Sequence, residues 1–136
     1  MSEAANKVVL LKEDYDLLTS LFATTKHFEV NELENYKSLI IELNKAVILN
    51  RKDFPIDVVR LNSIVTVKDK DTKSVMMFQI VLPIDGNIKN RKVSVLAPLG
   101  TALIGCKKGD RLSWPIAGGE KHFSIIDVSN HFFKTN

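Results

Sequence analysis

The chain has 136 residues, of which 45% are hydrophobic and 26% charged, and its 19 basic and 16 acidic residues give a formal net charge of +3. This composition excludes a disordered or collagen-like chain, and the length suits one domain, or one small domain with a helical extension. The basic excess is smaller than that of a protein that binds duplex DNA on its own. Because the basic residues are scattered, they form either a solvated surface or a docking face for an acidic partner or nearby nucleic acid.

The apolar stretches of the chain are too short for a membrane span or a secretory signal. No run reaches about 18 apolar residues, and the first one, residues 8–11, is shorter than the hydrophobic part of a signal peptide. We therefore expect a cytoplasmic protein with no membrane partner. A single cysteine, Cys106, excludes an internal disulfide and a Cys-rich metal site. Nothing near it would hold a thiolate, so we interpret it as a bystander.

Two helices are predicted in the first third of the chain. Residues 8–11 suit either a strand or the start of a helix, and hydrophobic residues at helical spacing then predict a helix over 13–24. A second amphipathic stripe over 33–49 predicts a helix of ~19 residues, about 28 Å long, with Asn31 as its N-cap. Consecutive helices with a short connection pair antiparallel. We expect residues 1–52 to form an N-terminal helical hairpin, a short coiled coil.

The remainder, residues 53–136, has the pattern of a β-rich domain. Pro55 ends the second helix, Pro98 opens a short helix, and Gly109-Asp110 predicts a tight turn. The strands are expected at residues 58–68, 75–82, 93–96, 111–116 and 121–128. The predicted fold class is therefore α+β, with a twisted antiparallel sheet that carries one short helix.

Residues 75–82, VMMFQIVL, form a nearly unbroken apolar run. Such a run predicts a strand that is buried on both faces or lies under a helix. We expect a monomer, although this strand could pair with a second copy if it lay at the edge of the sheet.

Two separated segments of the β-rich half resemble the Gre transcript-cleavage factors. In VSVLAPLGTALIGCKKGD, residues 93–110, the stretches Ala102-Leu103-Ile104-Gly105 and Gly109-Asp110 match the helix and turn of the family's C-terminal domain, and Ala97-Pro98 stands where the family has Ser-Pro. The segment PIDVVRLNSIV, residues 55–65, is similar to the start of the β domain in the Gre-like regulators of nucleoside diphosphate kinase, the members that the chain resembles most. The resemblance covers nearly the whole chain and implies an FKBP-like fold for residues 53–136.

The resemblance implies that RNA polymerase is the partner and that nucleic acid is reached only indirectly, through the polymerase. The candidates for contact with polymerase are the exposed parts of the Gly-Asp turn and its neighbours. They are Ser94, Pro98, Lys107, Lys108 and Asp110, with Arg111 or Trp114 as an anchor that fills a pocket of the partner. The function we expect is an elongation regulator that docks near the secondary channel and competes with cleavage factors without cleaving.

Gre factors hold a catalytic magnesium ion with acidic residues at the tip of a long coiled coil, because carboxylate oxygens suit this ion. The corresponding tip here contains Lys26, His27, Glu29, Glu32 and Glu34. It lacks the Asp-x-x-Glu pattern of the family, and the predicted helices are short. We therefore expect no catalytic residue, no metal and no cofactor.

Two other functions stay open. One is a Gre-type cleavage factor with a degenerate acidic tip. The other is a prolyl isomerase or chaperone, which the implied fold alone suggests. Its aromatic-lined pocket is hard to build here, because both tyrosines, Tyr15 and Tyr36, fall in the predicted helices. The histidines, His27, His122 and His131, are too far apart in sequence to indicate a metal site.

Overall fold

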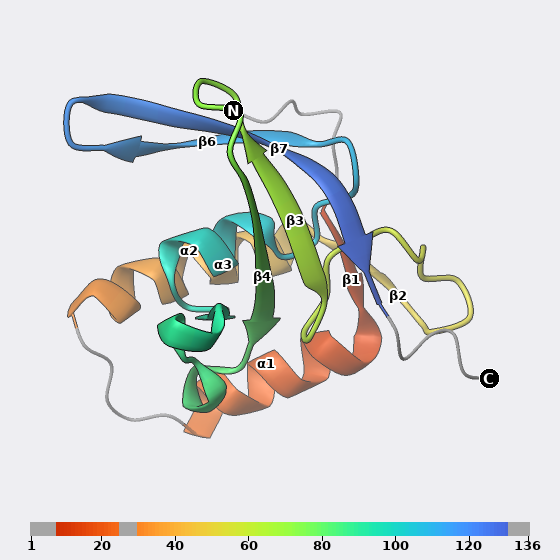
Figure 1. Cartoon of the computed structure of the whole chain (residues 1–136). Helices are drawn as coiled ribbons and strands as arrows, with labels where there is room; N and C mark the ends of the chain where they lie inside the picture. Colours follow the sequence, from red (N-terminus) through yellow and green to blue (C-terminus); the bar gives the residue numbers. More distant parts are fainter. Residues whose placement is uncertain (1–7, 25–29, 131–136) are drawn as a thin grey trace.

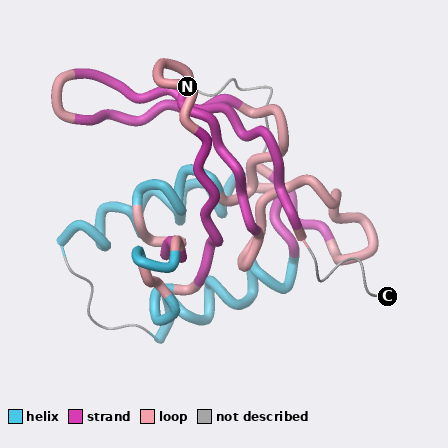
Figure 2. Tube along the Cα trace, in the orientation of Figure 1, coloured by secondary structure: helices cyan, strands magenta, loops and turns pink. Residues whose placement is uncertain are grey.

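The computed structural model describes residues 8–24 and 30–130, and Figures 1 and 2 show a curved sheet above a layer of helices. The helices are α1 (Lys12–Thr24), α2 (Val30–Lys45) and α3 (Pro98–Leu103), with short 3-10 helices η1 (Pro83–Asp85) and η2 (Ile88–Asn90). The strands are β1 (Val9–Leu11), β2 (Val47–Leu49), β3 (Ile64–Asp69), β4 (Val75–Val81), β5 (Lys92–Ser94), β6 (Arg111–Ile116) and β7 (Gly119–Ser129). No helix of the described residues is long and apolar enough to cross a membrane.

Five strands form the main sheet, in the order β5-β4-β3-β7-β6. β3 pairs antiparallel with both β4 and β7, and β7 pairs antiparallel with β6. β4 and β5, in contrast, are parallel, because the chain crosses back through η1 and η2 before it enters β5 (Figure 1). The prediction of an antiparallel sheet is wrong for this pair, and the sheet is mixed.

The first half of β4 is not buried on both faces, which corrects the prediction for residues 75–82. Val75 is 54% exposed and Met77 is 53% exposed, whereas Ile80 is buried. The long helices lie on one side of the sheet (Figure 1), so alternate side chains on the other side stay in contact with water. β4 lies inside the sheet, but β5 pairs only with its last part, Gln79–Val81.

The first long helix agrees with its predicted boundaries, and the second differs from them at both ends. The helix predicted over 13–24 is confirmed to within one residue by α1. The second helix is shorter than predicted, because α2 ends at Lys45 and the chain continues as β2, which pairs parallel with β1. Val47 and Ile48 are β-branched and favour extended backbone, and β1 gives them a partner. Asn31 is the second residue of α2, so it is not the N-cap.

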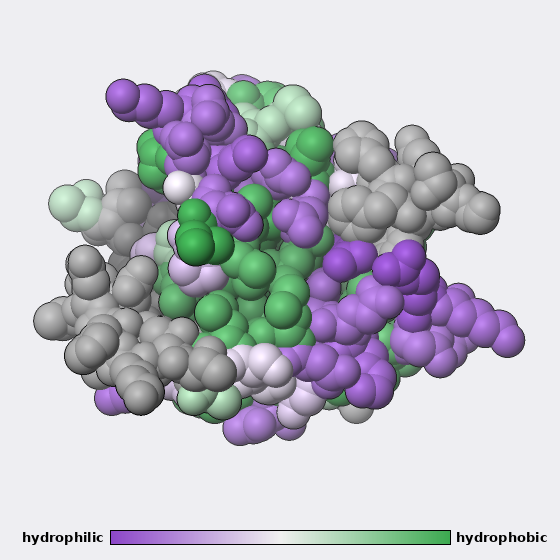
Figure 3. Space-filling view, turned by 90° about the horizontal axis from the view of Figure 1, so that it is seen from below, coloured by the Kyte–Doolittle hydropathy of each residue, from purple (hydrophilic) through white to green (hydrophobic). Residues whose placement is uncertain are grey.

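One hydrophobic core joins the helices to the main sheet. Leu18 of α1 and Leu39 of α2 belong to the same buried cluster as Ile125 of β7. α2 contacts α3, and α1 contacts β1 and β2. Seen from below, the molecule has an apolar surface in the middle of the view, with polar surface above and to the right of it (Figure 3). The inner parts of both helices therefore pack onto the β-rich half, and a coiled coil is not confirmed. The division of the chain into residues 1–52 and 53–136 stays a prediction.

Asp69, which is 4% exposed, holds the turn between β3 and β4. Its Oδ1 atom accepts hydrogen bonds from the backbone N–H groups of Asp71, at 2.8 Å, and Thr72, at 3.2 Å. Its Oδ2 atom lies 2.7 Å from Nζ of Lys121 on β7. The Lys121 ammonium and the two N–H groups lower the pKa of the Asp69 carboxyl from 3.8 to about 2.

This lowered pKa makes the free energy of unfolding depend on pH. The folded chain favours the carboxylate form of Asp69, so the stabilisation is complete above about pH 4 and is lost as the pH falls to about 2. We expect Asp69→Asn to destabilise the chain less at about pH 2.5 than at about pH 6. Urea unfolding of both chains at the two pH values measures this difference. An equal loss of stability at both values would contradict the assignment.

Candidate partner-binding site

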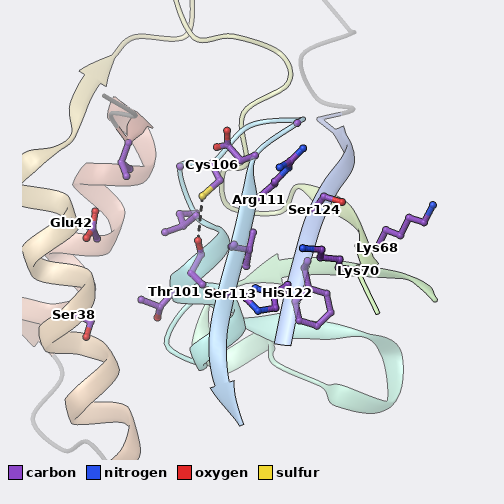
Figure 4. A pocket seen from close by; sticks show the side chains of 18 of the residues that line it. Ser38, Glu42, Lys68, Lys70, Thr101, Cys106, Arg111, Ser113, His122 and Ser124 are labelled. Atoms are coloured by element: carbon purple, nitrogen blue, oxygen red, sulfur yellow. Dashed lines mark hydrogen bonds between the residues drawn. The ribbon is translucent and has the colours of Figure 1, made fainter. Parts of the chain in front are cut away.

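An open groove of about 1600 Å³ lies beside the β6–β7 hairpin (Figure 4). Its lining comes from segments that are far apart in the sequence. The helices contribute Ser38, Glu42 and Lys45 from α2 and Thr101 and Ala102 from α3. The sheet and its turns contribute polar side chains, namely Lys68, Lys70 and Lys73 from β3 and the turn after it, Asp110, Arg111 and Ser113 at the start of β6, and His122 and Ser124 of β7. Cys106, Leu112 and Phe123 also line the groove. Cationic side chains outnumber carboxylates in this lining, so the groove suits a partner with both apolar and acidic groups.

The predicted Gly-Asp turn leads from α3 into β6 at one end of the groove. The Oδ2 atom of Asp110 accepts a hydrogen bond from the backbone N–H of Lys107 at 2.9 Å. Gly109 has a φ of +97°, a left-handed conformation that favours glycine. Its N–H donates to the carbonyl oxygen of Ile125 at 2.8 Å, which ties the turn to β7. The turn leaves the side chains of Lys107 and Lys108 exposed.

The N-terminal end of α3 lies very close to β5. Pro98 is the first residue of the helix, where its missing N–H costs nothing, and it is exposed. A Cβ atom at Gly100 would lie 2.1 Å from the carbonyl oxygen of Ser94, so this approach requires glycine. The Ser94 hydroxyl accepts a hydrogen bond from the backbone N–H of Leu96 at 3.0 Å. The Ser94 side chain therefore stabilises the turn between β5 and α3.

The predicted polymerase contacts do not form one cluster. Two of them line the groove, namely Asp110 and Arg111. Two lie on the exposed turn next to it, namely Lys107 and Lys108. Two lie outside the lining, near the N-terminal end of α3, namely Ser94 and Pro98. Trp114 belongs to β6, where its backbone pairs with Lys121, and its side chain is not described.

Sequence reasoning missed the cations that share the groove with Arg111. Lys45 comes from α2, and Lys68 and Lys70 come from β3 and the turn after it. These positions are far apart along the chain, and nothing in their spacing distinguished them from other scattered basic residues. The register of the strands brings Lys68 and Lys70 next to Arg111, and the packing of α2 adds Lys45 to the same groove.

Cys106 is a poor candidate for chemistry. Burial raises the pKa of its thiol to about 12, and its Sγ atom donates a hydrogen bond to the carbonyl oxygen of Ala102 at 3.3 Å. A thiol of this kind is protonated near neutral pH and is a weak nucleophile, which agrees with its interpretation as a bystander. Within residues 8–24 and 30–130, no group of three His, Cys, Asp or Glu could hold a metal ion.

The predicted hairpin tip is only partly described. Lys26, His27 and Glu29 lie outside the described residues. Glu32 and Glu34 belong to the first part of α2, and Glu34 is exposed. α2 has 16 residues, so it is about 24 Å long. The helix is therefore shorter than the sequence pattern predicted.

The family described as "Transcription elongation factor, GreA/GreB, C-term" matches residues 54–130, more than half of the chain. The regulator of nucleoside diphosphate kinase of Escherichia coli (strain K12) is 32% identical over 92 residues, which are 67% of this chain and 68% of that protein. The transcription elongation factor GreA of Clostridium novyi is 34% identical over 86 residues, which are 63% of this chain and 54% of that protein. The GreA protein is thus the longer of the two, and the match spans little more than half of it.

Solved structures show the same arrangement of elements. The prokaryotic transcription elongation factor GreA/GreB from Nitrosomonas europaea aligns with a TM-score of 0.76 and 28% identity, over 92% of this chain and 99% of that one. Gfh1 from Thermus aquaticus aligns with a TM-score of 0.51 and 26% identity, over 87% and 83% of the two chains. The similarity therefore extends beyond the β-rich half into the helices. It does not test the FKBP-like description, which stays a prediction.

Proposed function

Because the chain belongs to the GreA/GreB family of transcription elongation factors, we propose that it binds RNA polymerase and regulates elongation without stimulating transcript cleavage. The match to residues 54–130 carries this proposal, because it covers α3, the Gly-Asp turn and the β6–β7 hairpin beside the groove. In this proposal the contact uses the Gly-Asp turn and the end of the groove that lies beside it. The proposed contact residues are Ser94, Pro98, Lys107, Lys108, Asp110, Arg111 and Trp114, near the secondary channel of the polymerase.

The helices support the non-cleaving part of the proposal. Leu18 of α1 and Leu39 of α2 are fully buried, so the middle of each helix is held on the rest of the molecule. α1 and α2 are about 20 Å and 24 Å long, and only their outer parts are left to project into a partner. A cleavage factor must place carboxylates at a metal ion in the polymerase. We propose that this arm is too short to do so, and that the chain has no enzymatic activity.

Reversing two charges beside the groove is expected to weaken polymerase binding at least about tenfold, ~1.4 kcal/mol. The variant is Lys107→Glu with Lys108→Glu. Both side chains are exposed, and the ion pair of Lys108 with Asp127, at 3.9 Å, is too weak to make the fold depend on it. Binding to purified core polymerase is measured by surface plasmon resonance at low salt.

The matched control is Lys52→Glu with Lys89→Glu, which makes the same change of net charge at exposed positions outside the groove lining. Equal weakening by both variants would show that only net charge matters and would contradict the proposed surface. No binding by the unaltered chain would remove the proposal.

Cleavage is tested on backtracked elongation complexes. We expect no release of RNA 3′ ends when the chain is added alone, and slower cleavage when it is added together with a GreA protein, because the two compete for the polymerase. The similarity to GreA proteins makes a cleavage factor with a degenerate tip the second candidate. Cleavage that is lost in Glu29→Ala or Glu32→Ala would support that candidate instead.

A further inference from the structure

The outer face of the main sheet carries a row of cationic and hydroxyl side chains across three strands. Lys68 of β3 pairs with Ser124 of β7, and Ser124 pairs with Arg111 of β6. On β3, Val65 and Val67 are buried in the core, and Thr66 and Lys68, which alternate with them, are only partly buried. Since side chains alternate along a strand, Lys68 points to the opposite face, and its partners in the row share that face. We call this face the outer face.

A second row lies two residues further along the β6–β7 hairpin. The backbone N–H of Lys70 donates to the carbonyl oxygen of His122 at 2.8 Å, and His122 pairs with Ser113. Phe123 is buried in the core, so its neighbour His122 points to the outer face. Figure 4 shows these side chains on adjoining strands beside those of the first row. The two rows together form a polar patch that is part of the groove lining.

Carboxylates do not neutralise the cations of this patch. Among the ion pairs of the described residues, none involves Lys68, Lys70 or Arg111. The carboxylate of Asp69 is engaged by Lys121, and Glu120 lies 3.7 Å from Nε2 of His122. Two ammonium groups and one guanidinium group therefore stand at adjoining positions, and no carboxylate of the described part of the chain lies within ion-pair distance of them.

We propose that the two rows bind the sugar-phosphate backbone of a single-stranded nucleic acid. Ammonium, guanidinium and hydroxyl groups are the side-chain groups that most often contact phosphate oxygens. Neighbouring strands lie ~4.8 Å apart, and alternate residues along a strand lie ~7 Å apart. Six polar side chains at these spacings cover an area that spans several consecutive phosphates.

The composition of the patch favours this ligand over a protein segment or a duplex. The six side chains of the two rows are polar, namely Lys68, Ser124, Arg111, Lys70, His122 and Ser113. One exposed apolar side chain, Val75 of β4, lies beside Lys68 at the border of the patch. The charges stand at the centre of the patch, whereas the centre of a protein interface is depleted of charge. A duplex is read by a helix or a two-stranded ribbon that enters its groove. A broad sheet surface with basic groups instead resembles the platforms that carry single strands. The inference adds a direct contact with nucleic acid to the indirect one expected through the polymerase.

The test uses the full chain without polymerase and a short fluorescent single-stranded RNA, with binding followed by anisotropy. We expect binding that weakens with salt, with a slope of about −0.7 for each phosphate that is neutralised. Lys68→Gln with Lys70→Gln is expected to weaken binding about tenfold and to reduce the slope by about 1.4. The control, Lys37→Gln with Lys89→Gln, removes the same charge from exposed positions outside the patch and is expected to bind as the unaltered chain does.

Each other outcome overturns the inference. Equal weakening by both double variants would show attraction to net charge alone, and binding that does not respond to salt would exclude phosphate contacts. Competition by a polyglutamate peptide as strong as that by unlabelled RNA would assign the patch to an acidic protein segment. The variants are also compared in binding to core polymerase. Because Lys68 and Lys70 are not among the proposed polymerase contacts, unchanged polymerase binding separates this inference from the proposed function.

Discussion

Replacing Asp14 with alanine is expected to lower the free energy of unfolding by about 3–5 kcal/mol, because it breaks a buried ion pair. Asp14, in the first turn of α1, is 1% exposed. Its two carboxylate oxygens accept hydrogen bonds from Nε of Arg60, at 3.1 Å, and Nη2 of Arg60, at 2.8 Å. The backbone N–H of Leu61 donates to the same carboxylate at 3.0 Å. The alanine variant leaves the guanidinium of Arg60, a residue that is only 9% exposed, without this carboxylate.

The Asp14 carboxylate depends on its hydrogen-bond partners, as the direction of its pKa shift shows. Burial raises the pKa of the Asp14 carboxyl, while the Arg60 charge and the Leu61 N–H group oppose this effect. The carboxylate is therefore tolerated inside the molecule only while its partners surround it. Since Arg60 lies just before β3, the pair holds α1 to the β-rich half and sets the direction of the helical arm.

The neighbouring residue provides a matched control. Glu13 also forms an ion pair, with Nη2 of Arg51 at 2.8 Å, but both side chains are more than half exposed. Exposed pairs contribute about 0–1 kcal/mol, so Glu13→Ala is expected to change stability little. Guanidinium unfolding measured by far-UV circular dichroism compares the two variants. A loss in Asp14→Ala within about 1 kcal/mol of that in Glu13→Ala would contradict the role of the buried pair.

Gly100→Ala is expected to lower the free energy of unfolding by about 3 kcal/mol or more, through overpacking. By helix propensity alone, alanine at this position of α3 would stabilise the chain by about 1 kcal/mol. Steric repulsion opposes this gain, because the new Cβ atom would lie 2.1 Å from the carbonyl oxygen of Ser94 and 3.0 Å from Cα of Val95. Both contacts are with backbone atoms, so no side-chain rotation relieves them. α3 must move away from β5, and repulsion outweighs propensity.

Gly86→Ala is the control for this substitution. A Cβ atom there would meet the carbonyl oxygen of Pro83 at 3.4 Å, and Gly86 has a φ of −63°, which any residue adopts. This variant is expected to remain within about 1 kcal/mol of the unaltered chain. Thermal and denaturant unfolding measure both. Equal stability of the two variants would show that α3 does not need its close approach to β5.

A displaced α3 would also shift Pro98 and the Gly-Asp turn, so weaker polymerase binding is expected in Gly100→Ala.

Patterns between near neighbours in the sequence determined much of this molecule. Apolar residues at helical spacing identified α1, Pro98 marked the start of α3, and Gly109 marked the turn into β6. These signals are local, because a helix, a cap and a tight turn each depend on residues within a few positions of one another. The motif around α3 and the Gly-Asp turn also identified the family, and with it Asp110 and Arg111 of the groove.

Contacts between distant segments were decided by the tertiary structure alone. The Val47–Leu49 segment fits the stripe of a helix, and it becomes a strand because β1 lies beside it. The pair of Asp14 and Arg60 joins residues 46 positions apart, and the cationic rows depend on the register of β3, β7 and β6. A pattern read along the chain specifies which face of an element is apolar. It carries no record of which element lies opposite, since that depends on packing all of them into one core.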